Sequence, residues 1–323
     1  MSTWSCVRVF EYYLMLPPEL RMMVIDEMAP DDRGRFLRCS KLCNIETKSS
    51  KNYLFGLEII GYSENYIEIN VIHGGTEKFG KYHGYMLEFK NELGRKFVRY
   101  LTFGYQELWS IEISHSANLV LPAIIQFKKY LNLYQINIKR LTIIGQLFNN
   151  SQIVKNLGIE RLKNLEYLKV NSNVVSHVFS KLLRPLKSFE SFGEDYNGIL
   201  TSYEEIYHVQ DYVNLPRIKL TQSQFLTLTA SKIHIHIGEL TEENVLFFIK
   251  SWQNGNIRQS FKYCQWDLRA SNFNVRKLFR LLGKVIGDNS NVTMRLNHYK
   301  YCSGYAELFC SKDRLQLGFM TFN

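Results

Sequence analysis

The chain has 323 residues, of which 46% are hydrophobic and 14% aromatic, and its formal net charge is +10. This composition excludes an intrinsically disordered chain, and no uninterrupted apolar run is long enough to cross a bilayer. A chain of this length can bury about three quarters of its unfolded surface, so we expect one large domain with a small additional module. The six cysteines form no Cys-x-x-Cys pair and residues 1–15 lack a secretory cleavage site, which predicts reduced thiols in the cytoplasm or nucleus.

The spacing of residues 16–45 predicts two short helices. Pro17 and Pro18 suit a helix start, where backbone amides have no intrahelical partner. Four apolar residues of the first helix fall on one face, and two further ones fall on another: Leu20, Met23, Val24 and Met28, then Met22 and Ile25. Pro30-Asp31-Asp32 predicts a stop and a new N-cap, and Phe36, Leu37 and Ser40 recur at helical spacing in the second helix. So many apolar side chains exceed what a small bundle can bury alone, which predicts a partner.

This segment resembles an F-box, the adaptor-binding module of cullin-based ubiquitin ligases. The matching positions are Leu16, Pro17, Glu19, Leu20, Ile25, Met28, Pro30, Asp32, Leu37, Ser40 and Lys41. The family's usual tryptophan is replaced by Cys43, and Gly34 lies inside the second helix, where glycine costs about 0.5 to 1 kcal/mol relative to alanine. The resemblance implies that the module docks on a Skp-family adaptor, which links it to a cullin and a RING subunit. The implied adaptor-binding residues are Leu16, Pro17, Leu20, Met22, Ile25, Met28 and Leu37.

The next segment, from residue 51 to residue 103, has the alternation of β-strands. Four strands are expected around residues 57–59, 66–71, 85–89 and 97–101, with Gly61, residues 73–75 and Gly94 between them. Residues 73–75, His-Gly-Gly, lack the spacing of a phosphate-binding loop, so a hairpin turn is the better interpretation. The basic cluster Arg95, Lys96 and Arg99 is flanked by apolar residues, which predicts a solvated face rather than a nucleic-acid site.

From about residue 119 onward, strands alternate with helices at intervals of very roughly 22 to 30 residues. Residues 138–143 have the spacing L-x-x-L-x-L, and residues 165–173 extend it to the asparagine of a leucine-rich repeat, Asn173. Helices are expected over 120–131, 148–157 and 174–183. The predicted fold class is therefore α/β (α+β): a helical module, a strand-rich segment and a degenerate leucine-rich-repeat-like solenoid. A generic α/β sandwich could produce the same single good match.

Residues 231–255 predict a strand that leads into a capped helix. Thr241 is the expected N-cap, and Glu242 and Glu243 lie favourably in the first turn. The expected core stripe is Val245, Phe248, Ile249 and Trp252, ended by Asn254-Gly255. Residues 225–270 resemble the F-box-associated domain, type 2, of F-box families expanded in nematodes, on Leu240, Thr241, Asn244, Phe248, Lys250, Trp252 and Gly255. The proline that usually follows this glycine is absent.

Candidate chemical groups are few in this sequence. His234 and His236 share one side of a strand, but two ligands without a third do not make a metal site. Glu194-Asp195 and Glu204-Glu205 fall in loop-like sequence, where a solvated acidic loop is favoured over paired catalytic carboxylates. We therefore expect neither catalysis, nor a metal, nor a cofactor.

Together these patterns predict a substrate-receptor subunit of an F-box ubiquitin ligase. The expected module covers residues 12–50 and binds the Skp-family adaptor, and the expected body covers residues 51–323 and binds a protein substrate that the sequence does not identify. The location is expected to be cytoplasmic or nuclear, with no membrane partner. Two alternatives stay open. Residues 16–45 could be the first helical hairpin of a larger domain, and the chain could be a basic repeat protein that binds nucleic acid or another acidic partner without ligase function.

Overall fold

The computed structural model divides the chain into two compact units. The first consists of Met1–Ile59, Glu64–Arg140 and Glu160–Asn164, and the second of Ile60–Ser63, Leu141–Ile159 and Leu165–Asn323. The structure describes residues 12–28, 36, 39–43, 54–76, 81–102, 107–114, 118–134, 138–159, 162–193, 200–215, 221–236, 241–257, 261–268, 273–285, 292–297, 304–311 and 314–321.

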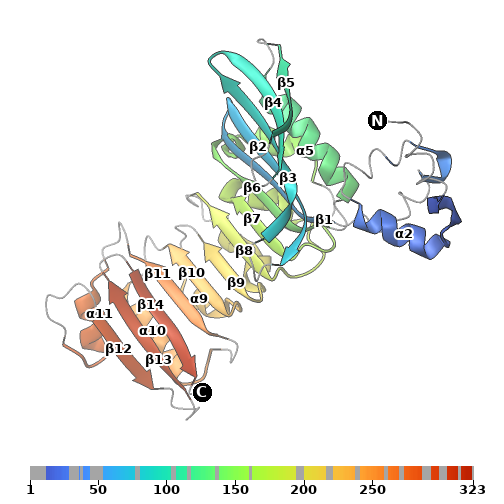
Figure 1. Cartoon of the computed structure of the whole chain (residues 1–323). Helices are drawn as coiled ribbons and strands as arrows, with labels where there is room; N and C mark the ends of the chain where they lie inside the picture. Colours follow the sequence, from blue (N-terminus) through green and yellow to red (C-terminus); the bar gives the residue numbers. More distant parts are fainter. Residues whose placement is uncertain are drawn as a thin grey trace. The chain divides into compact units, whose positions relative to one another are not determined.

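In the described part of the chain the first labelled elements are a helix, an antiparallel group of strands, a longer helix and a further strand (Figure 1). They are α2 (Pro18–Glu27), β1 (Leu54–Ser63), β2 (Tyr66–Thr76), β3 (Lys81–Glu92), β4 (Arg95–Thr102), β5 (Glu107–Ile113), α5 (Val120–Tyr134) and β6 (Ile138–Ile144). Strands β2 to β5 pair in sequence order as an antiparallel meander. Ile67, Ile69 and Val71 alternate along β2 and are buried, and the ring of Tyr85 on β3 meets Tyr130 of α5 at 6.1 Å. Helix α5 therefore covers the apolar face of this sheet.

The remaining elements alternate strands with short helices and end in an antiparallel group. They are η2 (Gln146–Asn149), α6 (Ser151–Asn156), β7 (Tyr167–Asn171), η3 (Ser172–Val174), α7 (Val175–Phe179), β8 (Ser188–Phe192), η4 (Leu200–Ser202), α8 (Glu204–Tyr207), β9 (Tyr212–Leu215), α9 (Gln222–Thr227), β10 (Lys232–His236), α10 (Glu242–Gln253), β11 (Tyr263–Asp267), α11 (Val275–Leu281), β12 (Val292–Asn297), β13 (Gly304–Ser311) and β14 (Arg314–Thr321). Strands β7 to β11 are parallel neighbours, and β14, β13 and β12 extend the sheet antiparallel from β11.

The core of the second unit lies between these strands and the helices that connect them (Figure 1). The ring of Phe248 on α10 lies 4.5 Å from Phe225 on α9 and 5.7 Å from Trp266 on β11. Phe261 packs edge-on against the same Phe248 ring at 5.4 Å. Successive side chains of a strand point to opposite faces of the sheet. Trp266 points to the helices, so Gln265, one residue before it, and Tyr263, three residues before it, point to the other face of β11.

A close backbone contact joins β1 to the turn after β6 and requires glycine. Gly145 has φ +119°, and a Cβ atom there would lie 2.2 Å from the carbonyl oxygen of Gly61. The Asn171 side chain secures the same turn, because it accepts from the Gly145 amide at 3.1 Å and donates to the Gly145 carbonyl at 2.8 Å. Asn173 donates to the Phe148 carbonyl. Asparagine side chains at the end of β7 and just beyond it therefore bond backbone groups of the preceding turn.

Many expected elements are confirmed, with changes at their ends. The four early strands, the helix from residue 120 and the helix after Thr241 all form. The helices expected over 148–157 and 174–183 are shorter, and each begins as a 3-10 turn, η2 and η3. The architecture is mixed α/β with a large sheet. The finer assignment to a leucine-rich-repeat solenoid stays a prediction.

Three expectations about local structure are wrong. Residues 73–75 continue strand β2 through a register shift after Ile72 and do not form the hairpin turn. Gly61 lies inside β1 and does not separate two strands. Its lack of a side chain makes room for Leu147, because a Cβ atom added at Gly61 would lie 2.9 Å from the Leu147 Cβ. Glu204 and Glu205 open helix α8 instead of lying in a loop, and acidic residues suit that end of a helix. Glu194 and Asp195 lie outside the described residues.

No helix in the described part of the chain is long and apolar enough to span a bilayer.

Candidate functional site

Helix α2 begins as its prolines predict. Pro17 is the N-cap, Pro18 is the first helical residue, and Glu19 lies in the first turn. The Arg21 side chain folds back and donates to the Leu16 carbonyl at 2.8 Å and more weakly to the Leu14 carbonyl at 3.4 Å. These bonds hold the preceding segment against the helix start, so the apolar residues of α2 are displayed from a defined position.

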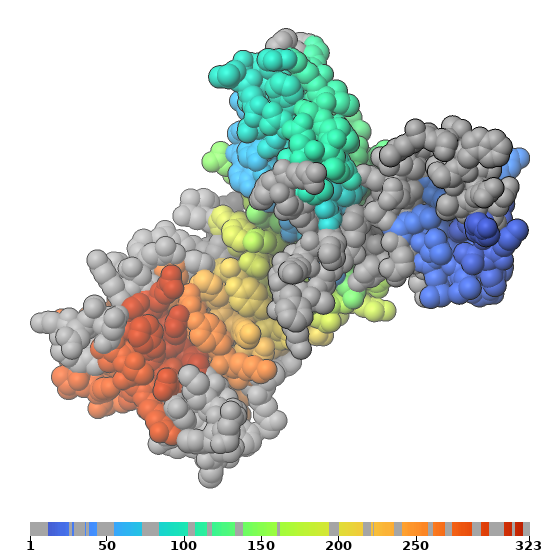
Figure 2. Space-filling model, viewed as in Figure 1, coloured from blue at the N-terminus to red at the C-terminus, as the bar shows by residue number. Residues whose placement is uncertain are grey.

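The apolar side chains of α2 divide between the surface and the interior. Leu20, Met23 and Val24, which we call the α2 stripe, are 44%, 61% and 39% exposed, whereas Ile25 is 0% exposed. The stripe residues are spaced at i, i+3 and i+4, so they lie on one side of the helix. Figure 2 shows α2, in blue, at the molecular surface. A helix with a buried anchor and an exposed apolar stripe is fixed in its own unit and still offers a binding surface.

The predicted adaptor-binding residues are placed in four ways. Pro17 and Leu20 are exposed, Leu16, Met22 and Met28 are half-buried, Ile25 is fully buried, and Leu37 lies outside the described residues. Ile25 therefore packs inside this chain, and its side chain is not available at the surface. Their role in binding an adaptor stays a prediction.

Sequence reasoning missed further exposed apolar residues beside α2. Tyr12, Leu14 and Met15 precede the helix and are all exposed. Tyr13, between them, is buried and meets the Phe36 ring edge-on at 4.9 Å. The sequence signal that could have found them is the apolar run over residues 12–15. The predicted helical periodicity begins at residue 16 and does not include this run.

The segment after Phe36 differs from the expected continuous second helix. Cys39 lies in a turn, and Ser40 begins a new helical segment over residues 41–43. The Ser40 hydroxyl accepts from the Cys43 amide at 3.1 Å, three residues on, which is the geometry of an N-cap. Serine competes with helix interiors through bonds of this kind, so its position breaks the predicted helix. Cys43 itself is buried.

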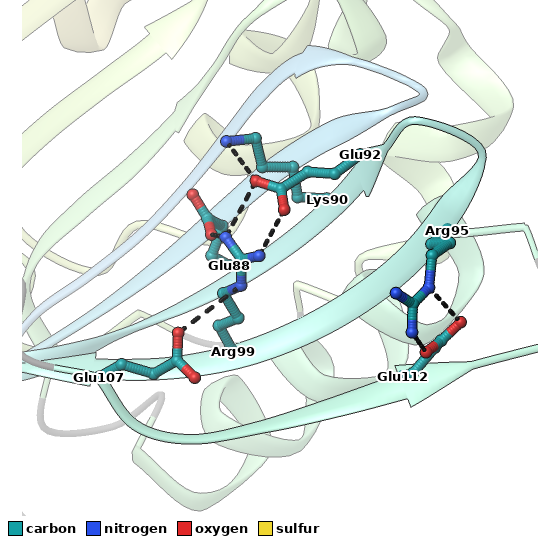
Figure 3. Close-up of polar contacts among 7 residues, drawn as sticks. All are labelled: Glu88, Lys90, Glu92, Arg95, Arg99, Glu107 and Glu112. Atoms are coloured by element: carbon teal, nitrogen blue, oxygen red, sulfur yellow. Dashed lines mark hydrogen bonds and ion pairs between the residues drawn. The ribbon is translucent and has the colours of Figure 1, made fainter.

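The strongest electrostatic cluster lies on the polar face of the antiparallel strands (Figure 3). The Arg99 guanidinium on β4 binds both carboxylate oxygens of Glu92 and contacts Glu88 at 3.3 Å. Hydrogen bonds from Arg99 and Lys90 lower the pKa of Glu92 to about 2. Arg95 pairs with Glu112 at a more exposed position of the same face. These contacts satisfy the charges within the sheet, so the cluster has the character of a structural network.

The described residues offer no metal centre. Within these ranges no group of three or more His, Cys, Asp or Glu side chains is placed to hold a metal ion. His234 is half-buried, and its Nε2 lies 2.9 Å from the Gln265 side-chain nitrogen. The structure describes no side-chain position for His236. The α2 stripe is therefore the candidate site that the geometry defines best.

Comparison with known proteins gives one family indication. No protein-family model matches the chain, and no solved structure matches it. A stretch of 102 residues, 31% of the chain, is 26% identical to a Caenorhabditis elegans protein described as uncharacterized F-box protein T20B12.4. The chain spans about a quarter of the length of that relative, 25%. This similarity suggests the F-box family.

Proposed function

We propose that the chain is a non-catalytic substrate receptor of an F-box ubiquitin ligase. In this role residues around α2 dock on a Skp-family adaptor, the adaptor connects to a cullin, and the C-terminal body binds a protein substrate. The observation that carries the proposal is the exposed α2 stripe on a proline-started helix with F-box spacing. The similarity to an F-box protein supports the same family.

The physical case rests on the cost of leaving the α2 stripe in water. Full burial of one Leu, Met or Val side chain contributes about 1.5 to 3 kcal/mol. Leu20, Met23 and Val24 are each about half exposed. An adaptor groove that covers them would therefore recover about half of this burial free energy from each side chain. Tethering a substrate beside the ligase's catalytic subunits then raises its effective concentration, so the receptor needs no catalytic residues of its own.

Adaptor binding by purified proteins tests the proposal. Leu20→Asp with Val24→Asp should abolish co-purification with a Skp-family adaptor, because two charges would enter an apolar contact. Leu20→Ala with Met23→Ala should weaken binding at least about ten-fold, because apolar contact area is lost. Alanine favours the helical conformation, so the helix itself should be retained. Leu183→Asp is the matched control, since Leu183 is also an exposed leucine but lies far along the chain in the second unit.

Circular dichroism of each variant must match that of the parent chain, so that loss of binding is not loss of folding. Undiminished adaptor binding by a folded Leu20→Asp, Val24→Asp variant would overturn the proposal. So would failure of the parent chain to bind any Skp-family adaptor. Ile25 is unsuitable for this test, because its buried position means that a charged substitution would unfold the helix.

A further inference from the structure

Three tyrosines form a row across the parallel strands of the second unit. In the strand register Tyr167 on β7 is opposite Ser188, Ser188 is opposite Tyr212 on β9, Tyr212 is opposite Lys232, and Lys232 is opposite Tyr263 on β11. A tyrosine therefore occurs on every second strand, with a small or flexible residue between. We call Tyr167, Tyr212 and Tyr263 the tyrosine row.

The tyrosine row lies on the sheet face that the helices do not cover. Val213 and Cys264, the next residues along β9 and β11, are fully buried, and side chains alternate along a strand. All three tyrosines are half-buried. Burial raises the pKa of Tyr212 and of Tyr263, so both hydroxyls stay protonated. Beyond Tyr263 the register continues to Gly318 on β14, and a Cβ atom there would lie 3.8 Å from the Tyr263 ring.

A second row, two residues further along each strand, has Lys169 and Glu190 on β7 and β8 and uncharged polar side chains from β9 onward. In register it places Asn214 beside His234, His234 beside Gln265, and Gln265 beside Gln316. The Gln265 side-chain oxygen accepts from the Tyr263 hydroxyl at 2.8 Å and from the Gln316 amide at 2.7 Å. Half-buried amide groups held in this way are fixed in place on the same face as the tyrosines. They offer donors and acceptors at defined positions.

The composition of this face indicates the kind of partner. Across β7 to β11 these two rows carry only Lys169, Glu190 and Lys232 as charged residues, although the whole chain has a net charge of +10. Phosphate backbones are held by clustered Lys and Arg, so this nearly neutral face is poorly suited to nucleic acid. Tyrosine with serine and asparagine is a combination that antibody-type surfaces use to bind proteins, because the rings are rigid and the small polar groups offer adaptable hydrogen bonds.

The spacing of the rings selects a conformation for the peptide. Tyrosines on alternate parallel strands are two strand separations apart, roughly 9.5 Å. A polyproline II helix repeats every three residues, or about 9.3 Å, and its backbone carbonyls make no internal hydrogen bonds. A proline at every third position would therefore lie between successive tyrosine rings, while the carbonyls face donors of the neighbouring row. We propose that the tyrosine row binds an extended, proline-containing protein segment in the polyproline II conformation.

This inference deepens the proposed function, because it names the class of segment that the receptor would capture. The test uses no adaptor, so the two proposals can fail separately. Fluorescein-labelled dodecaproline is titrated with the full chain and followed by fluorescence anisotropy, and a Gly-Ser peptide of the same length is the control probe. The full chain should bind dodecaproline and should not bind the Gly-Ser peptide. The Leu20→Asp, Val24→Asp variant should bind dodecaproline as tightly as the parent.

Substitutions on the face locate the binding site. Tyr212→Ala and Tyr263→Ala should each weaken dodecaproline binding at least about ten-fold, because each removes one stacking ring. Tyr212→Phe keeps the ring and should stay within about three-fold. Tyr62→Ala is the matched control, since Tyr62 is a tyrosine of β1 that is 48% exposed, and this change should leave binding unaltered.

Two results would overturn the inference. One is dodecaproline binding that is absent from the folded parent chain or unchanged in both alanine variants. The other is tighter binding of a labelled twelve-nucleotide uridine strand that Tyr212→Ala abolishes, because the row would then stack bases instead of proline rings. Thermal melting of each variant confirms that the sheet remains folded.

Discussion

The polar face of the antiparallel strands and the polar face of the parallel strands follow the same alternation but use different chemistry. On β3 and β4, Arg99 is committed to Glu88 and Glu92, and these charges satisfy one another (Figure 3). On β9 to β11, Tyr212 and Gln265 present rings and neutral amides. A face whose charges are already paired has little to offer a ligand, because each pair must be broken first. Neutral groups at fixed positions can exchange water for a partner at lower cost.

The largest effect expected concerns the helix layer that leaves only one face of the parallel sheet open. Phe248 is fully buried between Phe225 and Trp266. Phe248→Ala removes a large ring from this contact and leaves a cavity, so the free energy of unfolding should fall by about 3 to 5 kcal/mol. Urea unfolding followed by tryptophan fluorescence measures this directly, since Trp252 and Trp266 both lie in the second unit.

The neighbouring residue supplies a matched control for that experiment. Phe247 is 42% exposed on the same helix, one position before Phe248. Phe247→Ala should lower the free energy of unfolding clearly less than Phe248→Ala, because 42% of Phe247 stays exposed in the folded chain and its removal leaves no enclosed cavity. If both variants lost the same free energy of unfolding, the side of α10 that carries Phe248 would not be the one packed on the sheet. The distinction between a covered and an open face of the sheet would then be wrong.

The sequence was sufficient for elements whose signals are local. Thr241, the acidic first turn and Asn254-Gly255 mark the ends of α10, and the structure has the helix between them. The repeat-like spacing of residues 165–173 coincides with strand β7 (Tyr167–Asn171). Strand β5 and the antiparallel group β12 to β14 were not predicted. Strand β5 pairs with β4, and β12 and β13 pair with the strand that follows each of them, so among these strands only the pairing of β14 with β11 joins strands separated by other elements.

The candidate sites show the same limit. Periodicity separated Leu20, Met23 and Val24 from Ile25 as two faces of a helix, but it could not determine which face pointed inward. The structure buries Ile25 and leaves the other three exposed. The tyrosine row could not be predicted at all. Its three members are far apart in sequence, and only the register of β7 to β11 brings them into line.

A second prediction tests whether the charged face really is committed to its own pairs. Arg99→Leu leaves Glu88, a mostly buried carboxylate, without this partner, and should lower the free energy of unfolding by about 1 to 2 kcal/mol. It should also raise the pKa of Glu92, now about 2, toward its ordinary value, because the Arg99 hydrogen bonds that lower it are lost. NMR titration of the Glu92 side-chain carboxyl carbon measures that change.

The sign of the pH dependence follows from the lowered pKa of Glu92. Its contribution to stability is present above the ordinary pKa of a glutamate and disappears as pH falls toward about 2. The Arg99→Leu chain should lose this part of its acid sensitivity. Arg95→Leu is the matched control, because its pair with Glu112 is more exposed to solvent and should contribute little to stability. An unaltered Glu92 titration in Arg99→Leu would contradict the network.

The smallest effect expected is at the start of α10, one of the helices that connect the parallel strands. The Thr241 hydroxyl accepts from the Asn244 amide at 3.3 Å, and the Asn244 side chain accepts from the Thr241 amide at 3.1 Å. Thr241→Ala removes the first bond and should cost about 1 kcal/mol, whereas Thr241→Ser keeps the hydroxyl and should cost only a few tenths. Urea unfolding separates the two. If serine and alanine destabilise equally, the cap does not fix this helix, and its position over the sheet must come from Phe248 and its neighbours alone.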